Sequence, residues 1–181
     1  MRDEIERALG PLAGLPLWGV GRAADLLWLH FGARRRVEGV EGVEGVEDEV
    51  GDVTLHVSCP WRLRDDERVL VGSGDLMTPA DAAEDPETFE WDAPGASWLD
   101  VRIGELWPAG DTAPPTVASV AADALGGVRL TLAGGRVLEL FPNATPSGHV
   151  TTEFWRLLRP GGDEPHFVVG TFGISHDDGH T

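Results

Sequence analysis

Five side chains in this sequence have the chemistry to bind a ligand together. They are His56, Arg62, Trp155, Arg156 and His166. An arginine offers a planar fork to a carboxylate or phosphate, and a tryptophan ring offers a surface for stacking. If segments 53–64 and 153–158 are strands that line one concave face, these side chains could receive an anionic or aromatic ligand. We therefore treat them as candidate ligand-binding residues.

A purely structural role would also explain the two arginines. Arg62 and Arg156 each follow a tryptophan, Trp61 and Trp155, in a chain whose acidic residues outnumber the basic ones by 31 to 14. The arginines could pair with carboxylates and stack on these rings, and so hold an acidic protein together. Both interpretations are open at the level of the sequence.

A metal site is not expected. His56 and Cys59 lie three residues apart, and in a regular strand such residues point to opposite faces, so only a bulge at Pro60 would let them share an ion. The sequence contains no C-x-x-C or H-E-x-x-H spacing. The pair His176 and His180 lies in a polar tail, where weak ion binding carries no function. We predict neither a metal nor a cofactor.

No residue is predicted to be catalytic. The sequence has no G-x-S-x-G elbow for a nucleophilic serine. Carboxylates are frequent in 81–92, but Glu87, Glu90 and Asp92 are typical of a solvated surface, because a general acid needs an apolar pocket to raise its pKa. The lack of a recognisable nucleophile or general acid favours a binding protein over an enzyme.

The candidate residues depend on strands for their positions. Residues 53–64 alternate strictly between apolar and polar side chains, which predicts one long strand with a buried face. Residues 24–31 are apolar on both faces and predict a central strand, paired with 53–64 in a long hairpin. Helices are expected over 2–9 and 98–107, the second capped by Ser97.

The last third of the chain predicts a β-meander, because short apolar runs alternate with Gly and Pro. The expected strands are 116–124, 128–133, 137–141, 153–158 and 166–170. We predict an α+β fold with a predominantly antiparallel sheet of about eight strands, curled or split into a two-layer sandwich, with one or two short helices.

One domain is expected over 1–181, with two departures from compact structure. A repeated Val-Glu-Gly triplet occupies 37–52, and its period fits neither a strand nor a helix, so we predict a mobile loop. The polar segment 175–181 is expected to be a flexible tail.

Charge excludes some partners. The net charge is −17, which disfavours nucleic acid, because binding a polyphosphate needs clustered cations. Residues 65–112 hold 13 acids and 2 arginines, a charge of −11, and such a segment could attract a basic protein. The charged N-terminus, the lack of a long apolar run and the single Cys59 predict a cytoplasmic protein without a membrane span.

Two stretches resemble a family of small uncharacterised actinobacterial proteins. They are Leu55-His56-Val57-Ser58-Cys59-Pro60-Trp61-Arg62 and Glu153-Phe154-Trp155-Arg156, and the resemblance extends to 21–32 and 166–169. The resemblance implies a host and no catalytic residue. The acidic α+β character is also similar in style to immunity proteins that neutralise basic toxins. Our prediction is a non-enzymatic acidic binding protein for a basic partner, with a small-molecule pocket or enzyme as the alternative.

Overall fold

The computed structural model describes residues 1–37, 48–108, 113–148 and 150–178. These residues form two antiparallel sheets and two short α-helices, which confirms the predicted α+β class. The six-stranded sheet has the order β1-β2-β3-β9-β10-β11, and the five-stranded sheet has the order β5-β4-β8-β7-β6. The strands of the first sheet are β1 Leu17–Ala23, β2 Leu26–Val37, β3 Asp48–Val57, β9 Glu153–Leu158, β10 His166–Gly170 and β11 Gly173–Asp177. Those of the second are β4 Trp61–Arg64, β5 Val69–Gly72, β6 Val117–Ala122, β7 Val128–Leu132 and β8 Val137–Leu140.

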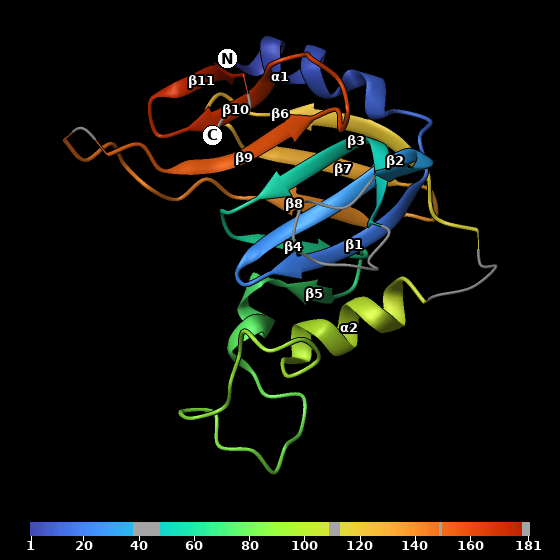
Figure 1. Cartoon of the computed structure of the whole chain (residues 1–181), viewed down its shortest axis with the longest axis vertical. Helices are drawn as coiled ribbons and strands as arrows, with labels where there is room; N and C mark the ends of the chain where they lie inside the picture. Colours follow the sequence, from blue (N-terminus) through green and yellow to red (C-terminus); the bar gives the residue numbers. More distant parts are fainter. Residues whose placement is uncertain (38–47, 109–112, 149, 179–181) are drawn as a thin grey trace.

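The two sheets pack face to face around one apolar core. The six-stranded sheet lies in front of the five-stranded sheet in Figure 1. Alternate side chains of both sheets fill the space between them, among them Leu55 and Trp155 from the first sheet and Leu63 and Leu130 from the second. Where a strand buries every second side chain, as β4 and β7 do, its other side chains are left on an outer face.

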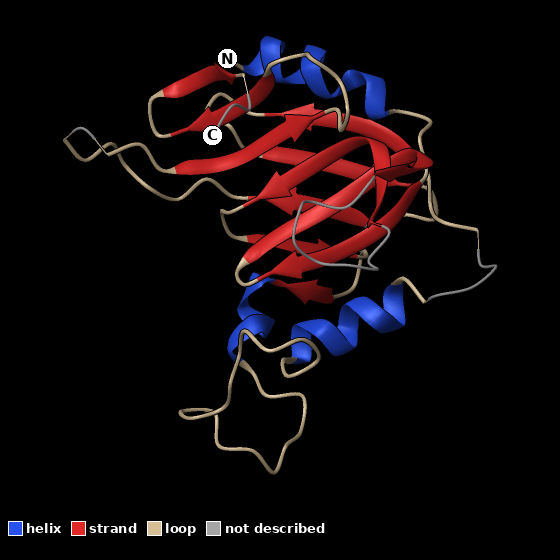
Figure 2. Ribbon diagram, viewed as in Figure 1, coloured by secondary structure: helices blue, strands red, loops and turns tan. Residues whose placement is uncertain are grey.

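Helices close the two ends of this sandwich (Figure 2). Helix α1 (Arg2–Leu9) packs beside β6 and buries Ile5 and Leu9. Helix α2 (Trp98–Leu106) lies beside β5 and β1, and it begins with the predicted cap, in which the Ser97 hydroxyl accepts a hydrogen bond from the Asp100 amide. Two 3₁₀ turns are also present: η1 (Gly10–Leu12) precedes β1, and η2 (Ser73–Met77) follows β5. No helix in the described part of the chain is long and apolar enough to cross a membrane.

The prediction of one strand over 53–64 is wrong. β3 ends at Val57 and β4 begins at Trp61, in the other sheet. Between them the amides of Ser58 and Cys59 both donate to the carbonyl of Phe154, at 2.8 and 3.0 Å, and Pro60 has no amide hydrogen to continue a ladder. The alternation survives this break because both strands face the same core.

The first hairpins extend further than the sequence indicated. The predicted strand over 24–31 is the first part of β2, and β1 precedes it across a turn at Ala24, whose φ is 51°. β2 and β3 pair as expected, from Leu27 opposite Val57 onward. Most of the predicted Val-Glu-Gly loop, residues 38–47, lies outside the described residues.

The C-terminal strands occur where they were expected, but their connection differs. β6, β7 and β8 form a meander in one sheet, whereas β9 and β10 belong to the other. The tail does not begin at residue 175, because Gly173–Asp177 pairs with β10 as β11. This strand has one apolar residue, Ile174. Its pairing depends on backbone hydrogen bonds, which an apolar sequence pattern does not reveal.

Candidate functional site

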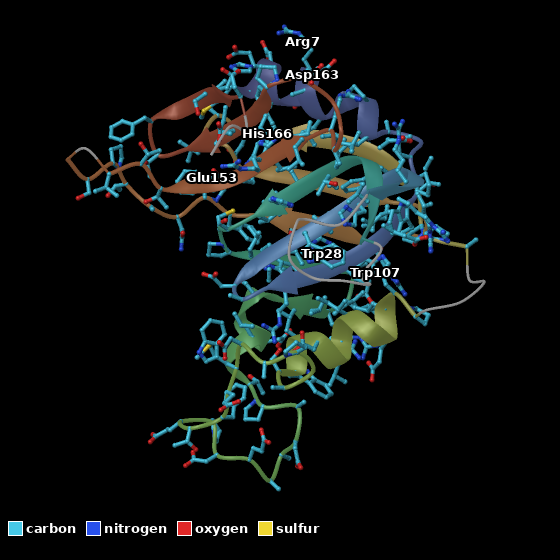
Figure 3. All side chains as sticks on the ribbon, in the orientation of Figure 1. Arg7, Trp28, Trp107, Glu153, Asp163 and His166 are labelled. Atoms are coloured by element: carbon cyan, nitrogen blue, oxygen red, sulfur yellow. The ribbon has the colours of Figure 1, made fainter. Side chains whose placement is uncertain are left out.

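Three of the five candidate residues meet on the outer face of the six-stranded sheet. His56 of β3 lies opposite Arg156 of β9, and Nη1 of Arg156 lies 3.2 Å from Nδ1 of His166 on β10. Figure 3 labels His166, the first residue of β10, and Glu153, the residue that opens β9. Strand pairing therefore brings together side chains that are separated by up to 110 positions in the chain.

Two carboxylates hold the guanidinium of Arg156. Its Nε and Nη2 donate to the two oxygens of Glu153 at 2.7 and 2.6 Å, and Nη1 donates to Asp177 at 3.3 Å. Residues three apart in a regular strand would face opposite ways, but β9 shifts register against β10 between Trp155 and Glu153. This bulge puts Glu153 on the same face as Arg156. We call Glu153, Arg156, His166 and Asp177, with His56, the Arg156 cluster.

The environment of His56 favours the neutral form of its imidazole. Burial lowers its pKa from the ordinary value, and the positive charge of Arg156 lowers it further, against a weaker opposing effect of Glu153. A neutral imidazole has one donor and one acceptor nitrogen. Next to the cluster is an open hollow of about 630 Å³, lined partly by Glu153, Arg156 and Asp177.

A row of neighbouring aromatic rings continues this outer face across β1 and β2. The ring centres of Trp18 and His30 are 5.3 Å apart, and those of Trp28 and His30 are 4.8 Å apart. The rings lie over the glycines of β1, since a Cβ at Gly21 would come within 2.2 Å of the Trp28 ring. Without glycine at this position the row could not pack against the strand.

His30 is the buried member of that row, and the sequence analysis did not single it out. Its Nδ1 lies 2.9 Å from the hydroxyl of Thr54, and both side chains are buried. Burial, reinforced by the nearby His56, lowers the pKa of His30 to about 4. The available signal was the Trp-x-His spacing of Trp28 and His30 opposite two glycines, which puts large rings on one face of a hairpin.

Arg62 and Trp155 do not join the other three candidates. Arg62 is on β4, in the five-stranded sheet, because the chain changes sheets after Val57. Trp155 is 0% exposed, and its Nε1 donates to the carbonyl of Gly126 at 2.8 Å inside the core. It neighbours Arg156 in sequence, and for that reason it faces the opposite side of the sheet. The expected common face of the five residues is therefore wrong.

Arg62 belongs instead to a second polar cluster, on the outer face of the five-stranded sheet. The carboxylate of Glu139 on β8 accepts hydrogen bonds from Arg62 at 2.8 Å, from Arg64 at 3.1 Å and from Arg129 at 3.2 Å. We call these four residues the Glu139 cluster. Burial raises the pKa of Glu139, but hydrogen bonds from Arg64 and Arg62 outweigh burial and hold it below the ordinary value. The sequence signal for Glu139 was an acid inside an otherwise apolar strand.

The remaining candidates have plain structural environments. Cys59 is buried, and burial raises the pKa of its thiol to about 11, so the reactive thiolate is not populated near neutral pH. The searched part of the chain, residues 1–37, 48–108, 113–148 and 150–178, contains no group of three or more His, Cys, Asp or Glu side chains that could hold a metal ion. His180 lies outside the described residues.

The chain was compared with protein-family models, curated proteins and solved structures. No protein-family model, no curated protein and no solved structure matches the chain. The resemblance to an actinobacterial family, carried by residues 55–62 and 153–156, stays a prediction.

Proposed function

We propose that this chain is a non-enzymatic, cytoplasmic binding protein whose acidic segment 78–96 recognises a basic protein partner. The segment lies between η2 and α2, and it contains no basic residue. Its acidic residues all have exposed side chains: Asp81, Glu84, Asp85, Glu87, Glu90 and Asp92. A dense field of one sign speeds the encounter with a partner of opposite charge and disfavours nucleic acid.

The observation that carries this proposal is the anchoring of the segment by Arg22. The guanidinium of Arg22 donates to the carbonyls of Trp91 and Ala93 at 3.0 and 2.9 Å, and it pairs with both oxygens of Asp100 at 2.7 Å. The Arg22 side chain is only 6% exposed. β1 and α2 thus hold one end of a segment that projects past α2 in Figures 1 and 2. A segment held in this way loses less entropy on binding than a free chain.

The surface of the segment has a shape that suits a cationic side chain. A hollow of about 450 Å³ is lined by Glu84, Asp85, Glu90 and the ring of Phe89, among others. An ammonium or guanidinium group is attracted both by carboxylates and by the face of an aromatic ring. The turns of the segment are fixed by their own acids, since Oδ1 of Asp81 and of Asp85 accepts amide hydrogen bonds at 2.8 and 3.0 Å. These features support an immunity-like role, in which a rigid acidic surface covers a basic protein.

The test compares two variants of equal net charge. The first neutralises the segment with Glu84→Gln, Asp85→Asn, Glu87→Gln and Glu90→Gln. The control neutralises four exposed acids elsewhere, with Asp3→Asn, Glu4→Gln, Asp66→Asn and Asp163→Asn. Partners of the wild type are captured from the native host, identified, purified and titrated against each protein.

We expect the segment variant to bind the purified partner at least about tenfold more weakly, and the control to bind like the wild type. Raising the salt concentration should weaken the wild-type complex, since salt screens exposed charges. Equal affinity of the two variants, or a partner without a basic surface, would contradict the proposal.

A second candidate function uses the Arg156 cluster as a small-molecule site. The observation in its favour is that His56, Arg156 and His166 meet beside an open hollow. It would take an aromatic ligand, or an anionic ligand whose acid group displaces Asp177 or Glu153 from Arg156. Substitution of His56 and His166 by Asn separates the two functions, since it should abolish small-molecule binding and leave the protein complex intact.

A further inference from the structure

Three arginines converge on a single carboxylate in the Glu139 cluster. β4 supplies Arg62 and Arg64, β8 supplies Glu139, and β7 supplies Arg129. The register puts Arg62, Glu139 and Arg129 opposite one another across the three strands. Both Nε and Nη2 of Arg62 and of Arg129 face the carboxylate, at 2.8 Å for Arg62 and at 3.2 and 3.1 Å for Arg129.

The cluster carries more positive charge than its carboxylate balances. Three guanidinium groups and one carboxylate sum to +2, on a protein whose net charge is −17. A guanidinium has five N–H donors, and within the described residues those of Arg62 and Arg129 hydrogen-bond only to Glu139. Their side chains are 43% and 59% exposed, whereas that of Glu139 is 6% exposed. The Glu139 carboxylate is therefore buried beneath Arg62 and Arg129, and their unused N–H donors lie on the solvent side.

A hollow adjoins these donors. It has a volume of about 220 Å³, and its lining includes Arg129, Glu139 and Phe141. The Arg62 guanidinium lies over the Phe141 ring, 5.0 Å from its centre. Asp123 also lines the hollow, and one of its oxygens is held by the amides of Leu125 and Gly127. The charged residues that line the hollow are Arg129, Glu139 and Asp123, and with Arg62 and Arg64, which hydrogen-bond to Glu139, the five groups sum to +1.

We propose that the Glu139 cluster is an oxyanion site, in which a phosphate or carboxylate group bridges Arg62 and Arg129. Glu139 acts as a positioning residue: it holds Nε and Nη2 of both guanidinium groups, so the remaining N–H groups are ordered before the ligand binds and their ordering does not oppose binding. The size of the hollow admits a small oxyanion or the anionic end of a larger molecule. The Phe141 ring gives an aromatic substituent a surface for contact. This site lies on the opposite sheet from the Arg156 cluster and is independent of the acidic segment.

Titration of the whole protein with inorganic phosphate, acetate and benzoate tests the site. Chloride at matched ionic strength is the reference. The readout is the nuclear magnetic resonance signal of each arginine Nε–H group, which reports the site of binding directly. Arg129→Gln removes one fork, and Arg7→Gln removes an exposed arginine of α1 as a matched change of charge.

We expect saturable shifts of the Arg62 and Arg129 signals, with a dissociation constant of about 1 mM or below for the best anion. Binding should be about tenfold weaker in Arg129→Gln and unchanged in Arg7→Gln. Tighter binding of phosphate would identify a phosphorylated ligand, and tighter binding of acetate or benzoate a carboxylate. Shifts that do not saturate, or that are the same in Arg129→Gln as in the wild type, would overturn the proposal.

Discussion

The two polar clusters of this protein are opposite in composition. In the Arg156 cluster one arginine is shared by two carboxylates, Glu153 and Asp177. In the Glu139 cluster one carboxylate is shared by three arginines. Both lie on outer faces of the same sandwich, and both were built by strand pairing. They differ in which charge is in excess.

That difference decides what each cluster can still bind. Arg156 has its charge compensated by its neighbours, so a further anion would have to displace a carboxylate that is already in place. The arginines around Glu139 have donors to spare. Both clusters contain arginine, so the presence of an arginine says little about function. The number of partners of each arginine and the net charge of the cluster are better guides.

The largest expected difference between the outer faces of the two sheets is in how their contributions to stability respond to acid. Burial holds the folded-state pKa of His30 at about 4, below its ordinary value of 6.5, and it lowers that of His56 in the same direction. The unfolded chain therefore binds protons first, and His30 contributes stability above pH 6.5 that is lost as the pH falls toward about 4. The loss should be about 3 kcal/mol in the free energy of unfolding. Denaturant titrations at several pH values measure it.

His30→Asn should flatten this pH dependence, while His176→Asn, which removes an exposed imidazole, should not. The Glu139 cluster has no histidine. The lowered pKa of Glu139 means that its contribution is lost only as the pH falls below its ordinary value of 4.5. An unchanged slope in His30→Asn would show that the pH dependence has another origin.

Removal of the shared carboxylate is expected to have the next largest effect. Glu139→Gln leaves three arginines side by side without a counter-charge, and it should lower the free energy of unfolding by about 2 kcal/mol. Urea denaturation measures the change, with the exposed Glu84→Gln as a control near zero. If both variants have the same stability, the cluster does not hold the strands together.

Removal of the shared arginine should cost less. Arg156→Gln leaves Glu153 and Asp177 near each other without their cation, but the Arg156 side chain is 26% exposed, so water solvates the remaining charges. We expect a loss of about 1 kcal/mol by the same denaturation experiment. A loss larger than that of Glu139→Gln would reverse the comparison between the clusters.

The smallest effect on stability is expected for Arg129→Gln. Two arginines still neutralise Glu139, and the substitution relieves repulsion among three cations, so the free energy of unfolding should change by less than about 0.5 kcal/mol. This near-neutral change, measured next to a tenfold loss of anion binding, would separate a binding role of Arg129 from a structural one. A loss as large as that of Glu139→Gln would assign Arg129 to stability instead.

Local patterns in the sequence were sufficient for the elements and the fold class. Short apolar runs located β7, β8, β9 and β10, and a serine cap located α2, whereas the alternation over 53–64 merged β3 and β4 into one strand. β1 and β11 were missed, since one contains alternate glycines and the other a single apolar residue. In both, backbone pairing with a neighbouring strand replaces the side-chain pattern that a sequence can show.

The sequence predicted only part of the candidate site, because local patterns do not specify which strands become neighbours. Period two correctly put His56 and Arg156 on polar faces, but it also suggested a common face for Arg62, which the turn at Pro60 moves to the other sheet. Glu139 was missed because its arginine partners come from strands whose pairing no local pattern specifies. His30 was missed although its hairpin was expected, because its burial depends on the side chains packed around it.

The sequence by itself determined where apolar residues recur in strands and how acidic the chain is, because these properties depend on neighbouring residues and on composition. Only the tertiary structure decided which charges meet. Whether an arginine is compensated, as Arg156 is, or in excess, as around Glu139, depends on register and sheet order across positions far apart in the chain. That long-range geometry is what separates a closed ion-pair network from a site with donors left to bind.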